Sequence, residues 1–169
     1  MRSRAERRRA RASALVALGS NLGDRNANIG SALDRIRIRP DCDIAAVSRL
    51  IETDPVGGPP QPRYLNGAAE VLTTLEPERL LQCLHEIEAE LGRVRSIPNA
   101  PREIDLDLLL YGDLVIDGPG IQVPHPRMLE RRFVLAPAAE IAPERLHPVT
   151  QRTLRSHLED LAAAERGPP

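Results

Sequence analysis

The segment 103–111, which reads Glu-Ile-Asp-Leu-Asp-Leu-Leu-Leu-Tyr, constrains this chain more than any other. Its residues alternate as in a β-strand, in which successive side chains point to opposite faces. Aspartate is rare in strands, and like charges on one face repel each other. Two acids among apolar neighbours therefore need an explanation. We predict one face with Ile104, Leu106, Leu108 and Leu110, and the opposite face with Asp105, Asp107, Leu109 and Tyr111.

Asp105 and Asp107 have the spacing of metal ligands. Residues two apart in a strand share a face, with their Cα atoms roughly 6.6 Å apart. Two carboxylates so placed can bind one hard cation, or straddle two ions about 3.5–4 Å apart. The alternative is a solvated strand face with two ordinary acids. The spacing alone does not decide between these interpretations.

Arginines precede this strand. Arg93 and Arg95 follow the end of a predicted helix, and Arg102 lies three residues before Asp105. Arginine forms bidentate contacts with phosphate oxygens. Taken singly, each arginine would more often pair with a nearby glutamate such as Glu88. Together with the aspartate pair, they indicate a clamp for a polyphosphate.

The other candidate binding residues are a histidine, an asparagine and two aromatic rings. His125 is fixed between two prolines, where it can donate a hydrogen bond to a phosphate oxygen. The chain has two Tyr, one Phe and no Trp, and Tyr64 and Phe133 lie next to candidate catalytic segments. Two rings can hold a flat heterocycle by stacking, and the amide of Asn66 can bond to its edge. Core packing is the alternative for Phe133.

The remaining pattern predicts an α+β protein. Short apolar or alternating runs indicate strands, and apolar residues at helical spacing indicate helices. Hairpin connections imply mostly antiparallel pairing, so we expect a mainly antiparallel sheet sandwiched by helices. The predicted strands are 13–18, 43–53, 64–73 and 103–111, with a hairpin to 114–116 and a further strand ending at Val123; the predicted helices are 25–39, 77–91, 127–134, 136–141 and 151–164.

Charge and composition exclude several classes of function. Residues 1–12 carry six Arg and one Glu, a net charge of +5, whereas the whole chain carries −1, so residues 13–169 carry −6. An acidic body argues against nucleic-acid binding. We expect a disordered basic tail at 1–12 and a single domain at 13–165. All 23 cationic residues are Arg, which excludes Schiff-base chemistry and phosphate sites built on Lys, such as the Walker A loop.

The sequence shows no sign of a membrane protein or of a disulfide framework. No apolar run approaches the roughly 20 residues of a membrane span, and the run 13–18 is too short for a signal-peptide core. Cys42 and Cys83 stand apart without metal-binding spacing, so we expect two buried thiols. We therefore expect a monomeric cytoplasmic protein that makes no membrane contacts.

Five motifs, in order along the chain, resemble those of the 6-hydroxymethyl-7,8-dihydropterin pyrophosphokinase family of folate synthesis. No single motif is specific, but the ordered set is, and the resemblance runs from about Leu15 to Leu161. The motifs are Leu18-Gly19-Ser20-Asn21-Leu22-Gly23-Asp24, Tyr64-Leu65-Asn66, Gly92-Arg93-Val94-Arg95, Pro101-Arg102 with Ile104-Asp105-Leu106-Asp107, and Val123-Pro124-His125-Pro126-Arg127-Met128.

The resemblance implies a ferredoxin-like α+β fold and an enzyme that transfers pyrophosphate from ATP to the hydroxymethyl group of the pterin, releasing AMP. It implies that Asp105 and Asp107 bind two Mg²⁺ ions that bridge the ATP phosphates. The pterin would stack between Tyr64 and Phe133. Its edge would be bonded by Asn66 and by the backbone of Thr53, Pro55 and Val56. The implied ATP-binding residues are Glu88, Arg93, Arg95, Arg102, His125 and Arg131, of which Arg93 and Arg102 are also catalytic.

One position departs from the family pattern, because Asn99-Ala100 stands where many members have Trp-Gly. If that Trp helps to seal the site, this protein closes less tightly or uses another residue. Two other functions compete with the enzyme. An RNA-binding module of the same fold would need sheet-face aromatics and a basic body, which the sequence lacks. An inactive relative acting as a scaffold is the second, and the intact aspartate pair argues against it.

Overall fold

The structure, a computed structural model, describes residues 11–93 and 99–167. A central five-stranded sheet carries helices on both faces, and a two-stranded hairpin lies beside it. The strands of the central sheet are β1 (Ala12–Ser20), β2 (Cys42–Val47), β3 (Ile51–Thr53), β4 (Tyr64–Thr73) and β5 (Asp105–Tyr111); the hairpin is β6 (Ile116–Gly118) and β7 (Ile121–Val123); the helices are α1 (Arg25–Arg37), α2 (Pro77–Glu90), α3 (Arg132–Ile141) and α4 (Leu154–Arg166).

The sheet topology confirms the predicted fold class. The strand order is β2-β4-β1-β5, with β3 also paired to β4, and every pairing is antiparallel. In chain order, β1-α1-β2-β4-α2-β5 is the split βαββαβ arrangement, in which each helix connects two parallel strands that have another strand between them. The fold is therefore α+β and ferredoxin-like.

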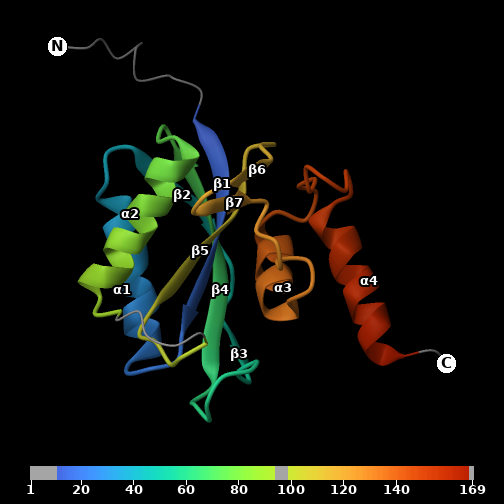
Figure 1. The fold of residues 1–169 in the computed structure, drawn as a ribbon, viewed down its shortest axis with the longest axis horizontal. Helices are drawn as coiled ribbons and strands as arrows, with labels where there is room; N and C mark the ends of the chain where they lie inside the picture. The colour runs from blue at the N-terminus through green and yellow to red at the C-terminus, as the bar shows by residue number, and fades with distance from the viewer. Residues whose placement is uncertain (1–10, 94–98, 168–169) are drawn as a thin grey trace.

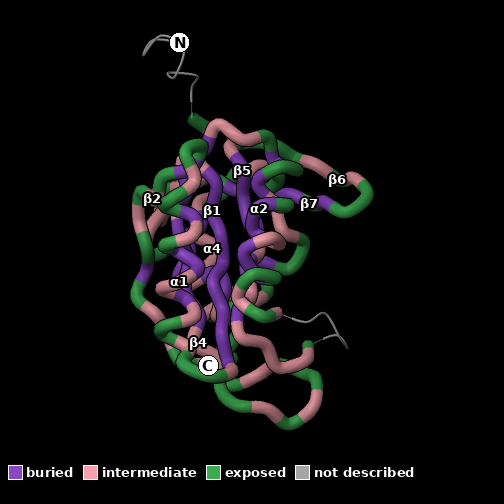
Figure 2. Tube along the Cα trace, turned by 90° about the vertical axis from the view of Figure 1, so that its left-hand side faces the viewer, coloured by how far each residue is buried: buried purple, intermediate pink, exposed green. Residues whose placement is uncertain are grey.

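The helices form two layers around the sheet. In Figure 1, α1 and α2 cover one face, and α3 and α4 lie on the other. Each face has its own apolar cluster, because strand residues alternate between the two sides. The central strand β1 is buried from Ala14 to Ser20, and Figure 2 shows it as a continuous buried stretch between the helices and the other strands. This rigid central strand holds the neighbouring end of β5 in place.

The alternation predicted for 103–111 holds for its first part only. Ile104, Leu106 and Leu108 pack in the cluster under α1 and α2, as predicted. Leu15 then pairs with Leu110 and Val16 with Leu108, so Leu109 is an extra residue in β5. This β-bulge reverses the facing of the residues that follow it. Leu110 therefore packs on the α3 side and Tyr111 on the α1–α2 side, the opposite of the prediction.

Several predicted elements differ from the structure. The predicted strand 43–53 is two strands, β2 and β3, and the predicted helices 127–134 and 136–141 are replaced by turns followed by the single helix α3. The predicted hairpin from 103–111 to 114–116 is wrong, because β6 pairs with β7. Cys42 and Cys83 are buried free thiols, as predicted.

The chain ends and the domain bounds are only partly covered. Strand β1 begins at Ala12, and residues 1–10 of the predicted tail 1–12 lie outside the described residues. The single domain at 13–165 stays a prediction. No helix within the described ranges is long and apolar enough to cross a membrane.

Candidate active site

A cavity of about 300 Å³ opens beside the first residues of β5, on the face of the sheet that carries α3. Its walls come from five parts of the chain: β3 with the loop after it, the start of β4, the connection between α2 and β5, the start of β5, and the segment leading into α3. Most of the residues singled out from the sequence meet here. The lining residues are Thr53, Asp54, Val56, Gln61, Tyr64, Asn66, Arg93, Asn99, Arg102, Asp105, Asp107, His125, Arg127, Arg131 and Phe133.

Asp105 and Asp107 both line this cavity, as expected for alternate residues of one strand. Their pairing partners in β1 are Gly19 and Ala17, which are small and leave space beside the carboxylates. Asp105 Oδ1 accepts hydrogen bonds from Arg93 Nη1 at 2.6 Å and from Arg102 Nη1 at 3.0 Å. The charge of Asp105 is therefore balanced by two guanidinium groups.

Asp107 is in a different electrostatic environment. Within residues 11–93 and 99–167, no group donates a hydrogen bond to its carboxylate and no cation forms an ion pair with it. Burial, together with the charges of Asp105 and Glu88, raises the pKa of Asp107 to about 7, against the opposing effects of Arg93 and Arg102. A carboxylate that lacks a partner and faces a cavity is suited to bind a cation.

Glu88 lies behind the strand rather than in the cavity. Its side chain is 3% exposed, it forms an ion pair with Arg93, and its Oε1 accepts the Leu106 N–H at 2.7 Å. Burial raises the pKa of Glu88, and the Leu106 hydrogen bond and the Arg93 charge oppose that rise. Glu88 therefore fixes the peptide between the two aspartates, and in the structure it contacts the expected ATP site through Arg93.

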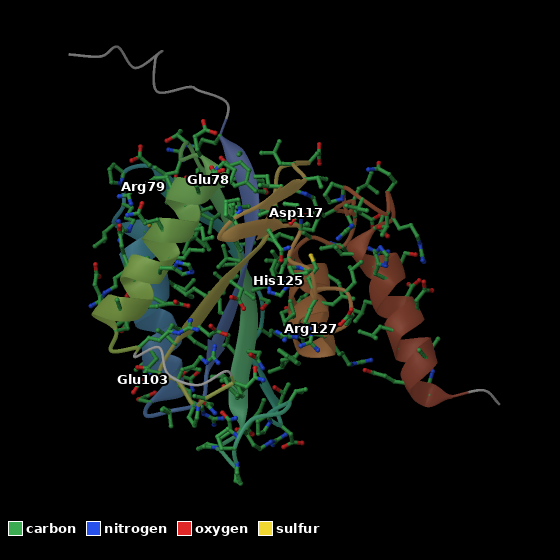
Figure 3. All side chains as sticks on the ribbon, viewed as in Figure 1. Glu78, Arg79, Glu103, Asp117, His125 and Arg127 are labelled. Carbon is green, nitrogen blue, oxygen red and sulfur yellow. The ribbon has the colours of Figure 1, made fainter. Side chains whose placement is uncertain are left out.

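His125 and two arginines form the opposite wall of the cavity. The His125 backbone N–H donates to the Leu109 carbonyl at 2.8 Å, so the bulge residue of β5 anchors this segment. His125 Nδ1 accepts the Arg127 N–H at 3.2 Å, which leaves Nε2 as the N–H donor. Burial, followed by the charge of Arg131, lowers the pKa of His125. Figure 3 shows His125 and Arg127 between β5 and α3.

The residues proposed to bind the pterin surround the other end of the cavity. Asn66 is 7% exposed, and its Nδ2 donates to Thr53 Oγ1 at 2.7 Å. Tyr64 and Phe133 line the cavity, and the guanidinium of Arg131 lies 5.9 Å from the centre of the Phe133 ring. Val56 also lines it, whereas Pro55 is in the same loop but does not.

A second cavity, of about 470 Å³, adjoins the first through Asp107 and His125. Its wall is more apolar and contains glycines from the β6–β7 hairpin. The other lining residues are Leu81, Leu108, Gly118, Gly120, Ile121, Gln122 and Pro126. The two shared residues thus stand between two adjoining pockets.

One predicted site residue cannot be placed, and some residues that line the cavity were not predicted. Arg95 lies outside the described residues. Sequence reasoning did not name Gln61 or Arg127 as binding residues, and it named Asn99 only as a departure from the family's Trp-Gly, although all three line the first cavity. Only Arg127 carried a signal that could have found it, since it is a cation two residues after His125. Gln61 carries none, because an uncharged residue in a loop gives no pattern, and Asn99 is marked only by its departure from the family's Trp-Gly.

The comparisons with known proteins agree with the geometry. A family model described as 7,8-dihydro-6-hydroxymethylpterin-pyrophosphokinase matches residues 15–143. The 2-amino-4-hydroxy-6-hydroxymethyldihydropteridine pyrophosphokinase of Pseudomonas aeruginosa is 44% identical over 149 residues, which cover 88% of this chain and 89% of that protein. The Bacillus subtilis protein of the same name is 46% identical over 128 residues, or 76% of this chain and 77% of its own.

Longer proteins also contain this region. The folic acid synthesis protein fol1 of Pneumocystis carinii is 41% identical over 146 residues, but this chain covers only 20% of it. A crystal structure of Plasmodium falciparum HPPK-DHPS has a TM-score of 0.74 at 15% identity and covers 92% of this chain, which spans 45% of that one. That likeness supports the fold. The family model and the bacterial relatives show that this chain belongs to the 7,8-dihydro-6-hydroxymethylpterin pyrophosphokinase family.

Proposed function

We propose that this protein transfers the pyrophosphate group of ATP to the hydroxymethyl group of 6-hydroxymethyl-7,8-dihydropterin in folate synthesis, releasing AMP, and that it requires Mg²⁺. One observation carries this proposal. Asp105 and Asp107 face a cavity whose remaining wall combines arginines with aromatic rings. Such a cavity can hold a polyanion at one end and a flat heterocycle at the other.

The heterocycle fits the end of the cavity formed by Tyr64, Asn66 and Phe133. Aromatic rings stack on flat ligands, with about 0.5–1.5 kcal/mol for each contact. The Asn66 amide is held by Thr53, so its oxygen is free to accept from the amino-pyrimidine edge of a pterin. The ring of Tyr64 is neutral during stacking, because the ordinary pKa of Tyr is about 10 and burial raises the pKa of Tyr64.

The nucleotide fits the second cavity. The more apolar wall around Leu81 and Ile121 suits an adenine ring, and the shared residues Asp107 and His125 lie where the phosphates would pass into the first cavity. Arg93, Arg102 and Arg131 line the first cavity and would contact the triphosphate there.

The residues present fit Mg²⁺ ions that arrive with ATP. Magnesium in proteins is commonly held by one or two carboxylates together with phosphate oxygens and water. Within the part of the chain that the structure describes, no third acidic, histidine or cysteine side chain joins the pair in a metal-binding cluster. Asp105 and Asp107 would therefore hold two ions only together with the phosphates. The bound ions neutralise charge on the phosphates.

The reaction requires the protein mainly to position the two substrates and to stabilise charge on the phosphates. The hydroxymethyl oxygen forms a bond to the β-phosphorus of ATP while the bond from that phosphorus to the oxygen shared with the α-phosphate breaks. The hydroxyl proton leaves to solvent, and AMP departs. Arg102 and Arg93 must exchange their contact with Asp105 for contacts with the phosphates. The Nε2–H of His125 donates to a phosphate oxygen, because its Nδ1 is already an acceptor.

Three further properties belong to this proposal. We expect the folded domain to span 13–165, to act as a monomer and to reside in the cytoplasm. Sedimentation of the purified full chain at micromolar concentration tests the second property. A sedimenting species of twice the 18.6 kDa chain mass would contradict it.

The direct test is product analysis. Purified protein is mixed with ATP, Mg²⁺ and 6-hydroxymethyl-7,8-dihydropterin, and the nucleotides are separated by ion-exchange chromatography. AMP should form in equal amount to the pyrophosphorylated pterin, and EDTA should abolish both. Formation of ADP would mean transfer of a single phosphoryl group, and the absence of any product would favour an inactive scaffold.

A further inference from the structure

The side chain of Gln61 joins four segments around the first cavity. Its Oε1 accepts hydrogen bonds from Asn21 Nδ2 at 2.9 Å and from the Tyr64 hydroxyl at 3.2 Å. Its Nε2 donates to the backbone carbonyls of Asn99 at 2.9 Å and Pro59 at 3.3 Å. A primary amide has two donors and one oxygen with two lone pairs. All of these are used here, so the position of Gln61 is fully determined.

Asn21 carries this network to the start of β5. Asn21 is 2% exposed. Its Oδ1 accepts the Arg102 N–H at 2.9 Å, and its own backbone N–H donates to the Arg102 carbonyl at 3.1 Å. Arg102 in turn forms an ion pair with Asp105 at 3.0 Å. A continuous set of hydrogen bonds therefore runs from Tyr64 through Gln61 and Asn21 to Asp105.

The two loops also pack closely where Gln61 meets Asn99. Gly58 has a φ of +77°, and a Cβ built on it would lie 2.6 Å from the Asn99 carbonyl oxygen. Asn99 itself has a φ of +56°, a conformation that Asn tolerates better than most residues. Neighbouring Gly57 has a φ of +72°, but its Cβ would meet nothing closer than Asn99 Nδ2 at 3.6 Å.

We propose that Gln61 is a positioning residue that couples pterin binding to nucleotide binding. The hydrogen bond to Tyr64 orients one wall of the pterin end. The hydrogen bond to Asn21 supports the backbone of Arg102, which Asn21 contacts, and the hydrogen bond to the Asn99 carbonyl fixes the loop three residues before Arg102. The family's usual Trp-Gly is Asn99-Ala100 here, so in this chain a polar contact joins the loops. This inference rests on the proposed function.

The coupling predicts a reciprocal effect on the two ligands. The coupling between two binding sites is reciprocal. A nucleotide that orders Arg102 must therefore also increase the affinity for the pterin. Loss of Gln61 must reduce that increase in affinity. A lost neutral hydrogen bond corresponds to about 0.5–1.5 kcal/mol. Removal of the Gln61 amide should therefore weaken pterin binding by about two- to tenfold in the presence of the nucleotide, and by less in its absence.

The experiment compares Gln61→Ala with the wild-type full chain. The dissociation constant of the pterin is measured by fluorescence titration, with and without Mg²⁺ and an ATP analogue that has a methylene group between the α- and β-phosphorus atoms. Steady-state AMP formation gives KM and kcat separately. We expect a rise in the pterin KM with a smaller change in kcat, and circular dichroism should show an unchanged fold.

A glycine pair provides a matched control. Gly58→Ala and Gly57→Ala impose similar backbone strain because both positions have positive φ, but only Gly58→Ala pushes against Asn99. Gly58→Ala should reproduce the effect of Gln61→Ala, and Gly57→Ala should not. This pair decides the question even if Gln61→Ala does not fold. Equal nucleotide enhancement of pterin binding in wild type, Gln61→Ala and Gly58→Ala would overturn the inference. Failure of the wild type to form AMP would instead refute the proposed function.

Discussion

The exchange of Asp107 for Asn should change the pH dependence of stability. Asn has nearly the same shape as Asp but stays neutral at both pH 5 and pH 8. In the folded protein, burial and the nearby acids raise the pKa of Asp107 from 3.8 to about 7. The folded state therefore binds this proton more tightly than the unfolded state does. Stability that is present below pH 3.8 is lost as the pH rises towards 7, and the loss is complete above 7.

The magnitude follows from the size of the pKa change. One pKa unit corresponds to about 1.36 kcal/mol, so ionisation of Asp107 destabilises the ligand-free fold by roughly 4 kcal/mol when complete. About 1.6 kcal/mol of this is already present at pH 5, so the part that develops between pH 5 and pH 8 is roughly 2–3 kcal/mol. The unfolding free energy of Asp107→Asn, relative to that of the wild type, should rise by this amount between pH 5 and pH 8.

The difference in unfolding free energy between the two proteins is measured by urea unfolding, monitored by circular dichroism, in EDTA at pH 5 and at pH 8. Glu88 is present in both proteins, so the effect of its own burial is common to both. The exposed substitution Asp113→Asn serves as the control and should follow the wild type. Mg²⁺ with a non-hydrolysable ATP analogue should restore stability at pH 8 to the wild type but not to Asp107→Asn. A difference in unfolding free energy that is the same at pH 5 and pH 8 would refute the electrostatic reasoning.

Substitutions at three further positions test other parts of the site. Glu88→Ala leaves the buried Leu106 N–H without its acceptor and should lower the unfolding free energy by about 1–3 kcal/mol, whereas Glu88→Gln retains an acceptor and should lose less in the same urea titration. Phe133→Ala should weaken pterin binding by about 0.5–1.5 kcal/mol and leave binding of the ATP analogue unchanged in parallel titrations; equal losses for both ligands would argue against stacking. Gly19→Ala places a Cβ 3.1 Å from Asn66 Oδ1 and should raise the pterin KM more than it lowers kcat; an unchanged KM would count against Asn66 as a pterin contact.

The aspartate pair could be located from the sequence because the property that reveals it is local. A strand period of two puts Asp105 and Asp107 on one face whatever the rest of the chain does. The fold class could also be predicted, since the strand and helix patterns alternate along the chain and short turns favour antiparallel pairing. Tyr64 and Phe133 were identified because aromatic residues are scarce in this chain.

The features that sequence reasoning missed depend on contacts between distant residues. The bulge at Leu109 arises from the pairing of β5 with β1, and no residue type in 103–111 indicates it. Gln61 and Asn99 are 38 residues apart, and each is an ordinary loop residue by itself. The role of Glu88 behind the strand depends on how α2 packs against β5. The helical pattern of α2 predicts which face of the helix packs, but not which residue of β5 each side chain contacts.

The most direct test of the central claim is a crystal structure of the full chain with Mn²⁺ and the α,β-methylene analogue of ATP, in which anomalous scattering locates the metal. Two anomalous peaks should appear between the analogue's phosphates and the carboxylates of Asp105 and Asp107, with Arg93 and Arg102 moved from Asp105 to phosphate oxygens. Metal density in contact with phosphates but with neither aspartate would contradict the account.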